Sequence, residues 1–150
     1  MAAQVHVSGV CPNVEVVKFL VSAGADVNIQ DDAGNSPFHV AVYFMYINNI
    51  ETLELFVSNG ADVNAKNGMG STPLHLVASG EGKVEAVKFL VSHGADVNAT
   101  NNDGMTPLDV AKASKDWNAN MWGRERLKER EVVEYLESVG AKSGKDLDAL

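Results

Sequence analysis

The clearest hydrophobic pattern in the chain is a helical one that occurs twice. Residues 14–22 read VEVVKFLVS and residues 84–92 read VEAVKFLVS, so the two segments differ at one position. Their apolar residues recur at spacings of three and four, which is the period of one face of a helix. Glu15 and Lys18 fall on the outward side, and their separation of three residues favours a weak surface ion pair. Each segment therefore predicts an amphipathic helix with one buried face.

Two short motifs recur around these helices at a nearly fixed distance. GADVN occurs at residues 24–28, 60–64 and 94–98. A proline motif occurs as SPFH, TPLH and TPLD at residues 36–39, 72–75 and 106–109. The GADVN copies are spaced by 36 and 34 residues. A fixed period in this range indicates an array of structural repeats.

The TPLH-like start followed by a GADVN-like turn resembles the ankyrin repeat, which consists of a β-turn and two helices. The resemblance covers about residues 4–141. It implies an all-α repeat solenoid of stacked helix-turn-helix units with short β-turn fingers. We expect a single domain over residues 1–150, with units at about 4–28, 29–64, 65–98 and 99–141 and a frayed C-terminal tail at 142–150.

The residues of these motifs have physical roles in starting or ending a helix. Thr72 is a good N-cap, and Pro73 suits the first helical position, where its missing N–H has no partner in any case. His75 stands at the third helical position, from which its imidazole can reach back to the cap. Asp109 takes that place in the last unit, where an acid is favourable at the positive end of the helix dipole. Gly94 follows an apolar run and should end its helix in the left-handed conformation.

Two units depart from the period. The second contains three extra residues around Tyr43–Asn49, which predict a longer first helix carrying aromatic residues. The fourth contains about thirteen extra residues, with Trp117 and Trp122 inside the excess. The charged segment 124–131 favours helix and should extend the second helix of that unit at its start. The first unit has a weak first helix, as expected for a terminal repeat.

The composition limits which partners the chain is expected to bind and in which compartment it is expected to reside. The net charge is −8 and the pI about 4.8, which opposes binding to nucleic acid and to anionic membranes. Cys11 is the single cysteine, so no disulfide can form within the chain. The N-terminal residues lack a signal peptide pattern, and no apolar run reaches the length of a membrane span. We expect a cytoplasmic, intracellular monomer.

The sequence shows no set of residues arranged for catalysis or for metal binding. His39 and His75 occupy the cap position of the repeat, which favours a structural role over a catalytic or metal-binding one. No histidine pair has the spacing of a helical metal site, and no cysteine pair exists. The carboxylates recur with the repeat period in turns, where they serve turn formation. We therefore expect no enzyme activity, no metal and no cofactor.

The remaining hypothesis is a protein-binding module, either a scaffold or an adaptor. In proteins of the ankyrin family the partner usually lies along the concave side, against the finger tips and first helices. Transferred to this chain, that placement gives finger residues Asp32, Ala33, Asn35, Gly68, Met69, Ser71, Asn102, Asp103 and Met105, and helix residues Tyr43, Phe44, Ser79 and Ala113. Trp117 and Trp122 are added as an insert that either contacts a partner or packs on the last repeat. The alternative function is an inhibitor or regulatory subunit of an enzyme, with the tryptophan insert blocking a site on its target.

Overall fold

The computed structural model describes residues 14–43, 50–79, 84–117 and 125–149. Within these ranges the chain is all-helical and contains no strand. The helices are α1 (Val14–Ser22), α2 (Pro37–Tyr43), α3 (Ile50–Ser58), α4 (Pro73–Ala78), α5 (Val84–Ser92), α6 (Pro107–Trp117), α7 (Glu125–Ser138) and α8 (Gly144–Asp148). None of them is long and apolar enough to cross a membrane.

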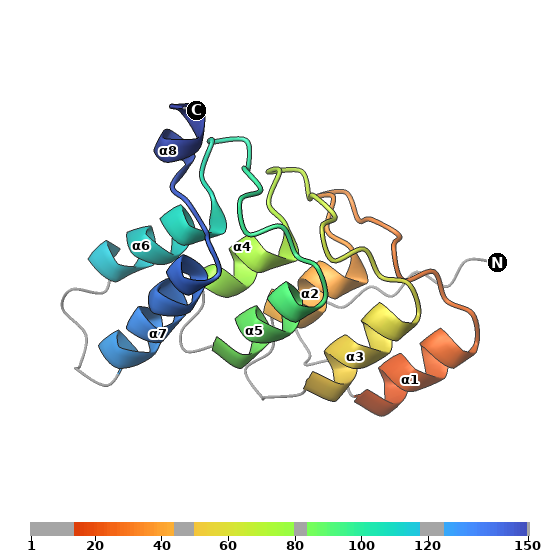
Figure 1. The fold of residues 1–150 in the computed structure, drawn as a ribbon. Coiled ribbons are helices and arrows are strands. Elements are labelled where there is room, and N and C mark those ends of the chain that lie inside the picture. The colour runs from red at the N-terminus through yellow and green to blue at the C-terminus, as the bar shows by residue number, and fades with distance from the viewer. Residues whose placement is uncertain (1–13, 44–49, 80–83, 118–124, 150) are drawn as a thin grey trace.

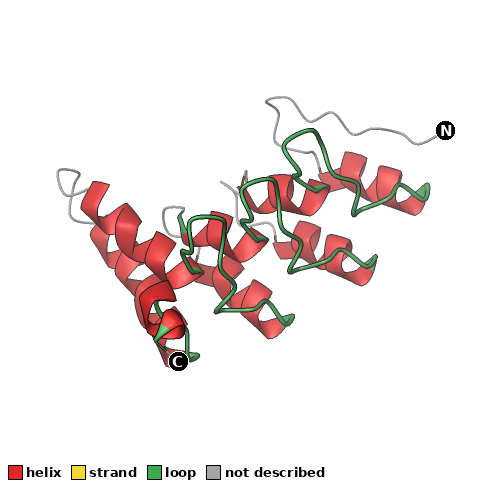
Figure 2. Cartoon of the chain, turned by 90° about the horizontal axis from the view of Figure 1, so that it is seen from above, coloured by secondary structure: helices red, strands yellow, loops and turns green. Residues whose placement is uncertain are grey.

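The helices form two rows, as the sequence predicted (Figure 1). The first helices of successive units make one row, in which α2 packs on α4 and α4 packs on α6. The second helices make the other row, where α1 packs on α3 and α5 packs on α7. Extended loops connect each second helix to the next first helix and project from the stack (Figure 2). The fold is therefore the expected solenoid of stacked helix pairs.

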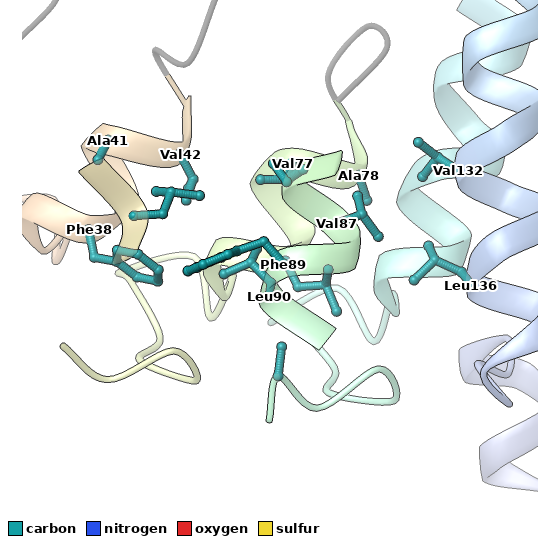
Figure 3. Close-up of a cluster of buried hydrophobic side chains, with 14 of the residues drawn as sticks. Phe38, Ala41, Val42, Val77, Ala78, Val87, Phe89, Leu90, Val132 and Leu136 are labelled. Carbon is teal, nitrogen blue, oxygen red and sulfur yellow. The ribbon is translucent and has the colours of Figure 1, made fainter. Parts of the chain in front are cut away.

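The core runs through the stack as a continuous row of neighbour contacts. Figure 3 shows apolar side chains that are contributed by successive helix pairs. The Phe38 and Phe56 rings meet edge to face with centroids 6.0 Å apart, a favourable arrangement for aromatic pairs. Leu90 and Leu136, in the next two units, are fully buried. Each unit thus buries apolar side chains between its own two helices and against the neighbouring units.

The predicted helix caps are present. The backbone N–H of Thr72 donates to Nδ1 of His75 over 3.1 Å, and the Thr72 hydroxyl lies 2.9 Å from the same nitrogen. Ser36 and His39 repeat this arrangement at the start of α2, with Ser36 N–H donating to Nδ1 over 3.2 Å. Both histidines are buried. The capping interpretation of the TPLH motif is confirmed.

The helix-ending glycine is confirmed at Gly94, which has a φ of +87°. Nothing lies within 4 Å of the position that a Cβ would take there, so only the backbone conformation requires glycine. We expect Gly94→Val to lower the free energy of unfolding by about 1–2 kcal/mol, because a β-branched residue resists positive φ. Urea unfolding measures this loss. Gly94→Asn is the matched control, since Asn tolerates the left-handed region, and a valine variant as stable as the asparagine variant would contradict the assignment.

The structure tests the two insertions only in part. α7 begins at Glu125, well before the apolar residues Val132 and Val133, so the predicted extension of this helix is confirmed. α6 runs to Trp117 and is the longest of the first helices among the described residues. The predicted continuation of α2 beyond Tyr43 falls in 44–49, outside the described residues.

The expectation of a frayed C-terminal tail was wrong. Residues 144–148 form α8, and Lys142, in the segment before it, is hydrogen-bonded to Asn98 and Thr106 of the last repeat. Gly144 is buried at the start of α8, and a Cβ there would collide with the carbonyl oxygen of Gly104. The absence of a side chain at Gly144 lets the tail lie directly on the last finger.

Candidate protein-binding face and the frame that holds it

The fingers are tied to one another by backbone hydrogen bonds near their tips. Gly68 N–H donates to the Ala33 carbonyl over 2.9 Å, and Asn102 N–H donates to the Met69 carbonyl over 3.0 Å. The Asn102 side-chain amide also donates to the Gly68 carbonyl over 3.1 Å. Three successive finger tips therefore stand side by side in fixed register, although they are separated by more than thirty residues in sequence.

Asparagines of the GADVN motif connect each unit to the next. The Asn64 amide donates to the Gly94 carbonyl over 3.0 Å, and its Oδ1 accepts the Asp96 N–H over 2.8 Å. Asn28 makes the same pair of bonds to Gly60 and Asp62. Each asparagine thereby satisfies one donor and one acceptor of the following helix end, which is exposed to solvent.

The capping histidines carry a second connection between units. Because Nδ1 of His75 accepts a backbone N–H, the ring proton is on Nε2, which donates to the Met105 carbonyl over 3.0 Å. His39 donates in the same way to the Ser71 carbonyl over 3.2 Å. Burial lowers the pKa of both imidazoles, outweighing the opposite effect of their bonds to these carbonyls. The neutral histidine thus links its own helix cap to the next finger.

Asp109 takes the place of the capping histidine in the last unit, but it accepts a hydrogen bond from the following segment instead of donating one. Its Oδ2 accepts the Thr106 N–H over 3.0 Å, as the histidines accept the cap. The same oxygen accepts the Gly144 N–H over 2.8 Å, so the carboxylate holds the tail where a histidine would hold a finger carbonyl. Partial burial opposes ionisation of Asp109, but these hydrogen bonds outweigh it and hold its carboxyl pKa below the usual value. Lys142 adds bonds to Asn98 and to the Thr106 hydroxyl.

This frame leaves two sets of residues at the surface. The finger tips, defined as residues 32–33, 68–69 and 102–103, are all exposed. The first-helix row consists of the equivalent positions Tyr43, Ser79 and Ala113, which are exposed as well. Two of these residues are large and apolar: Tyr43 is 53% exposed and Met69 is 65% exposed.

Most of the predicted finger residues lie at the surface, with one clear exception. Ser71 is 7% exposed, and its backbone makes bonds to His39 and Asn67, so its side chain offers little surface, and its contact with a partner stays a prediction. Asn35 and Met105 are half-buried. Phe44 and Trp122 lie outside the described residues, and only the backbone of Trp117 is described.

Sequence analysis missed a set of apolar positions beside the first-helix row. Val40, Leu76 and Val110 are half-buried and each precedes a residue of that row by three. Residues three apart on a helix share a face, so these side chains extend the surface around Tyr43. The signal was available in the sequence as an apolar residue following each TPLH-like motif.

The fold and its connections between units define a class of protein: a stacked-repeat solenoid whose surface residues differ while its frame repeats. The family model for ankyrin repeats (3 copies) matches residues 5–67 and 44–142, and the chain belongs to the ankyrin repeat family. Repeats of this family are generally protein–protein interaction modules and are typically non-catalytic.

A relative in a virus supports this assignment. A 37-residue segment, 25% of this chain, is 54% identical to the ankyrin repeat protein FPV219 of Fowlpox virus (strain NVSL). The matched segment covers 8% of that protein. Among the described residues, no group of three or more His, Cys, Asp or Glu side chains could hold a metal ion.

Proposed function

We propose that this chain is a non-catalytic interaction module that binds another protein on the finger tips and the first-helix row. The observation that carries the proposal is the exposure of Met69 and Tyr43, at 65% and 53%, on positions that the repeat motif does not specify. Methionine and tyrosine are enriched at the cores of protein interfaces. A flexible thioether at a finger tip also adapts readily to a partner surface.

The supporting frame favours binding over catalysis. The buried histidines have both ring nitrogens occupied by the caps and the neighbouring fingers. Asp109 is likewise occupied by backbone N–H groups. The titratable groups that carry perturbed pKa values near the fingers therefore serve the stack, and the face offers shape and apolar area to a partner. The negative net charge of −8 favours a protein partner over nucleic acid.

Substitution on the proposed face should separate binding from stability. Met69→Ala is expected to shift the melting temperature by less than about 2 °C, since surface substitutions usually change stability by only a few tenths of a kcal/mol. An interface anchor truncated to alanine typically costs about 2 kcal/mol or more, which is roughly a 30-fold loss of affinity. Tyr43→Ala should behave similarly in binding.

The measurement begins with a photo-crosslinking residue at position 69 in cells that express the protein. A second crosslinker at Lys88, an exposed second-helix residue paired with Glu85, is the matched control. The partner captured at position 69 is then purified, and its dissociation constant is measured with the wild type, Met69→Ala and Lys88→Ala. Equal crosslinking at both positions, or equal affinity of all three proteins, would refute this face as the binding site.

A further inference from the structure

The acidic side chains of the fingers fall into two groups that the structure uses differently. Asp31, Asn67 and Asn101 stand at the base of successive tips, and the side-chain oxygen of each accepts two backbone N–H groups of its own finger. Their role is the turn. The carboxylates of Asp32 and Asp103, at the tips, are exposed and make no hydrogen bond or ion pair within the described part of the chain. The frame therefore leaves these two carboxylates free to pair with a partner.

An exposed apolar side chain lies between the two carboxylates. Met69 occupies the tip of the middle finger and is 65% exposed. The N–H groups of Gly68 and Asn102 each donate to a carbonyl of the preceding tip, so the three tips form one connected row (Figure 2). The order of side chains along this row is acidic, apolar and acidic, given by Asp32, Met69 and Asp103.

The fingers do not neutralise these carboxylates themselves. Between each GADVN asparagine and the following proline motif, the three fingers together carry the carboxylates of Asp31, Asp32 and Asp103 and the single cation Lys66. Lys66 Nζ donates to the Thr100 carbonyl over 2.8 Å, so this cation is held along the stack by the next finger. The row of tips therefore combines apolar surface with a net negative charge, which complements a basic partner.

The stack sets the distance between the two carboxylates. The three fingers lead into α2, α4 and α6, which pack in succession. Because packed helices lie about 8–10 Å apart, the first and third tips are about 16–20 Å apart. This span corresponds to about five or six residues of extended chain or about eleven to thirteen residues of helix. A partner that pairs with both carboxylates must present two basic groups at this separation.

We infer that the finger tips bind a basic segment of another protein, in which an apolar residue contacts Met69 and a basic residue on each side of it pairs with Asp32 or Asp103. The inference rests on the proposed function, because it names the chemistry of the partner that this face selects. The apolar contact supplies most of the affinity, whereas the two ion pairs speed association and exclude acidic segments.

The test uses peptides selected on the full chain from a random display library. A peptide length of about 16 residues holds the required span in either conformation. Peptides that bind the face are recognised by Met69→Ala, which should weaken them roughly 30-fold. We expect these peptides to carry two basic residues with an apolar residue between them.

The charges are then tested with one such peptide. Asp32→Asn and Asp103→Asn should each lower its affinity about 2- to 5-fold, as expected for exposed ion pairs. Glu54→Gln is the matched control, since it removes one exposed carboxylate from α3 on the second-helix row and should leave the affinity unchanged. Asp103→Lys should weaken binding further, and replacing the paired basic residue of the peptide with glutamate should restore binding to this variant.

The outcomes separate this inference from the proposed function. If peptides weakened by Met69→Ala lack paired basic residues, or are unaffected by Asp32→Asn and Asp103→Asn, the inference is overturned while the proposed face stands. If no peptide is enriched, or if none is weakened by Met69→Ala or Tyr43→Ala, the finger tips do not bind such a segment. The inference is then overturned, and the proposed face loses support as well.

Discussion

Gly34→Ala is expected to lower the free energy of unfolding by about 3 kcal/mol, through a backbone collision between two fingers added to strain at a left-handed residue. Gly34 has a φ of +75°, and a Cβ there would lie 2.5 Å from the Gly68 nitrogen and 3.1 Å from the Asn67 carbonyl carbon. These are backbone atoms of the next finger, so they cannot move aside as a flexible side chain could. Relief of the collision would break the bond from Gly68 N–H to the Ala33 carbonyl.

Gly104→Ala isolates the collision from the strain. Gly104 has a φ of +72° at the equivalent position of the last finger, but nothing lies within 4 Å of its Cβ position. We expect Gly104→Ala to lower the free energy of unfolding only through the strain of a side chain at positive φ, by about 1–2 kcal/mol. Urea unfolding of both variants gives the difference directly. If Gly34→Ala and Gly104→Ala were equally destabilised, the close approach of the fingers would contribute nothing to stability.

Acidification from pH 7.5 to pH 5 is expected to destabilise the protein through His39 and His75. Burial lowers the pKa of both imidazoles in the folded state relative to the ordinary value of 6.5. Below that value the unfolded chain takes up protons that the folded chain does not, so the free energy of unfolding falls with pH. This loss continues until the folded-state pKa values are reached. The loss linked to Asp109, whose pKa is lowered from 3.8, begins only at lower pH.

His75→Gln should separate the pH effect from the hydrogen bonds. At pH 7.5 we expect it to cost about 2 kcal/mol, because the Thr72 N–H and the Met105 carbonyl lose their shared partner. Between pH 7.5 and pH 5 its stability should change less than that of the wild type, since one titrating group is gone. The measurement is the urea midpoint of both proteins across this range, with His93→Gln as a control on an exposed histidine. Parallel curves for wild type and His75→Gln would contradict the linkage.

The frame of the fold was predictable because its determinants are local. Pro73, His75 and Gly94 each act within one helix end, so their spacing alone identifies the cap and the helix stop. Exposure was less predictable, since it depends on which neighbour covers a position. Phe19 and Phe89 stand in almost the same sequence, yet Phe19 is exposed and Phe89 is buried, because Phe89 lies in a later unit of the stack and also packs against the ring of His93.

The sequence predicted which positions of the candidate face lie at the surface better than it predicted the contacts of the individual residues. Met69 and Tyr43 were among the positions that the family resemblance assigned to the partner face, and both are exposed. The burial of Ser71 was not predictable, because a count along the motif does not show that its carbonyl accepts the His39 proton beneath the finger. The role of the GADVN asparagines was also hidden, since their partners lie thirty or more residues away in the next unit.

Asp109 affects where further repeat units can be added to the array. A histidine at this place passes a hydrogen bond to the carbonyl of a following unit, so a unit like the third can be duplicated internally and each copy finds its successor. A carboxylate has no proton to pass on, and here Asp109 already accepts the N–H of Gly144 at the start of α8. If a copy of a unit followed the fourth unit, the Asp109 carboxylate would face the carbonyl of the added finger, and both groups are acceptors. Copies inserted before the fourth unit would not create this contact. Asp109 therefore favours the insertion of further units before the fourth unit over their addition after it.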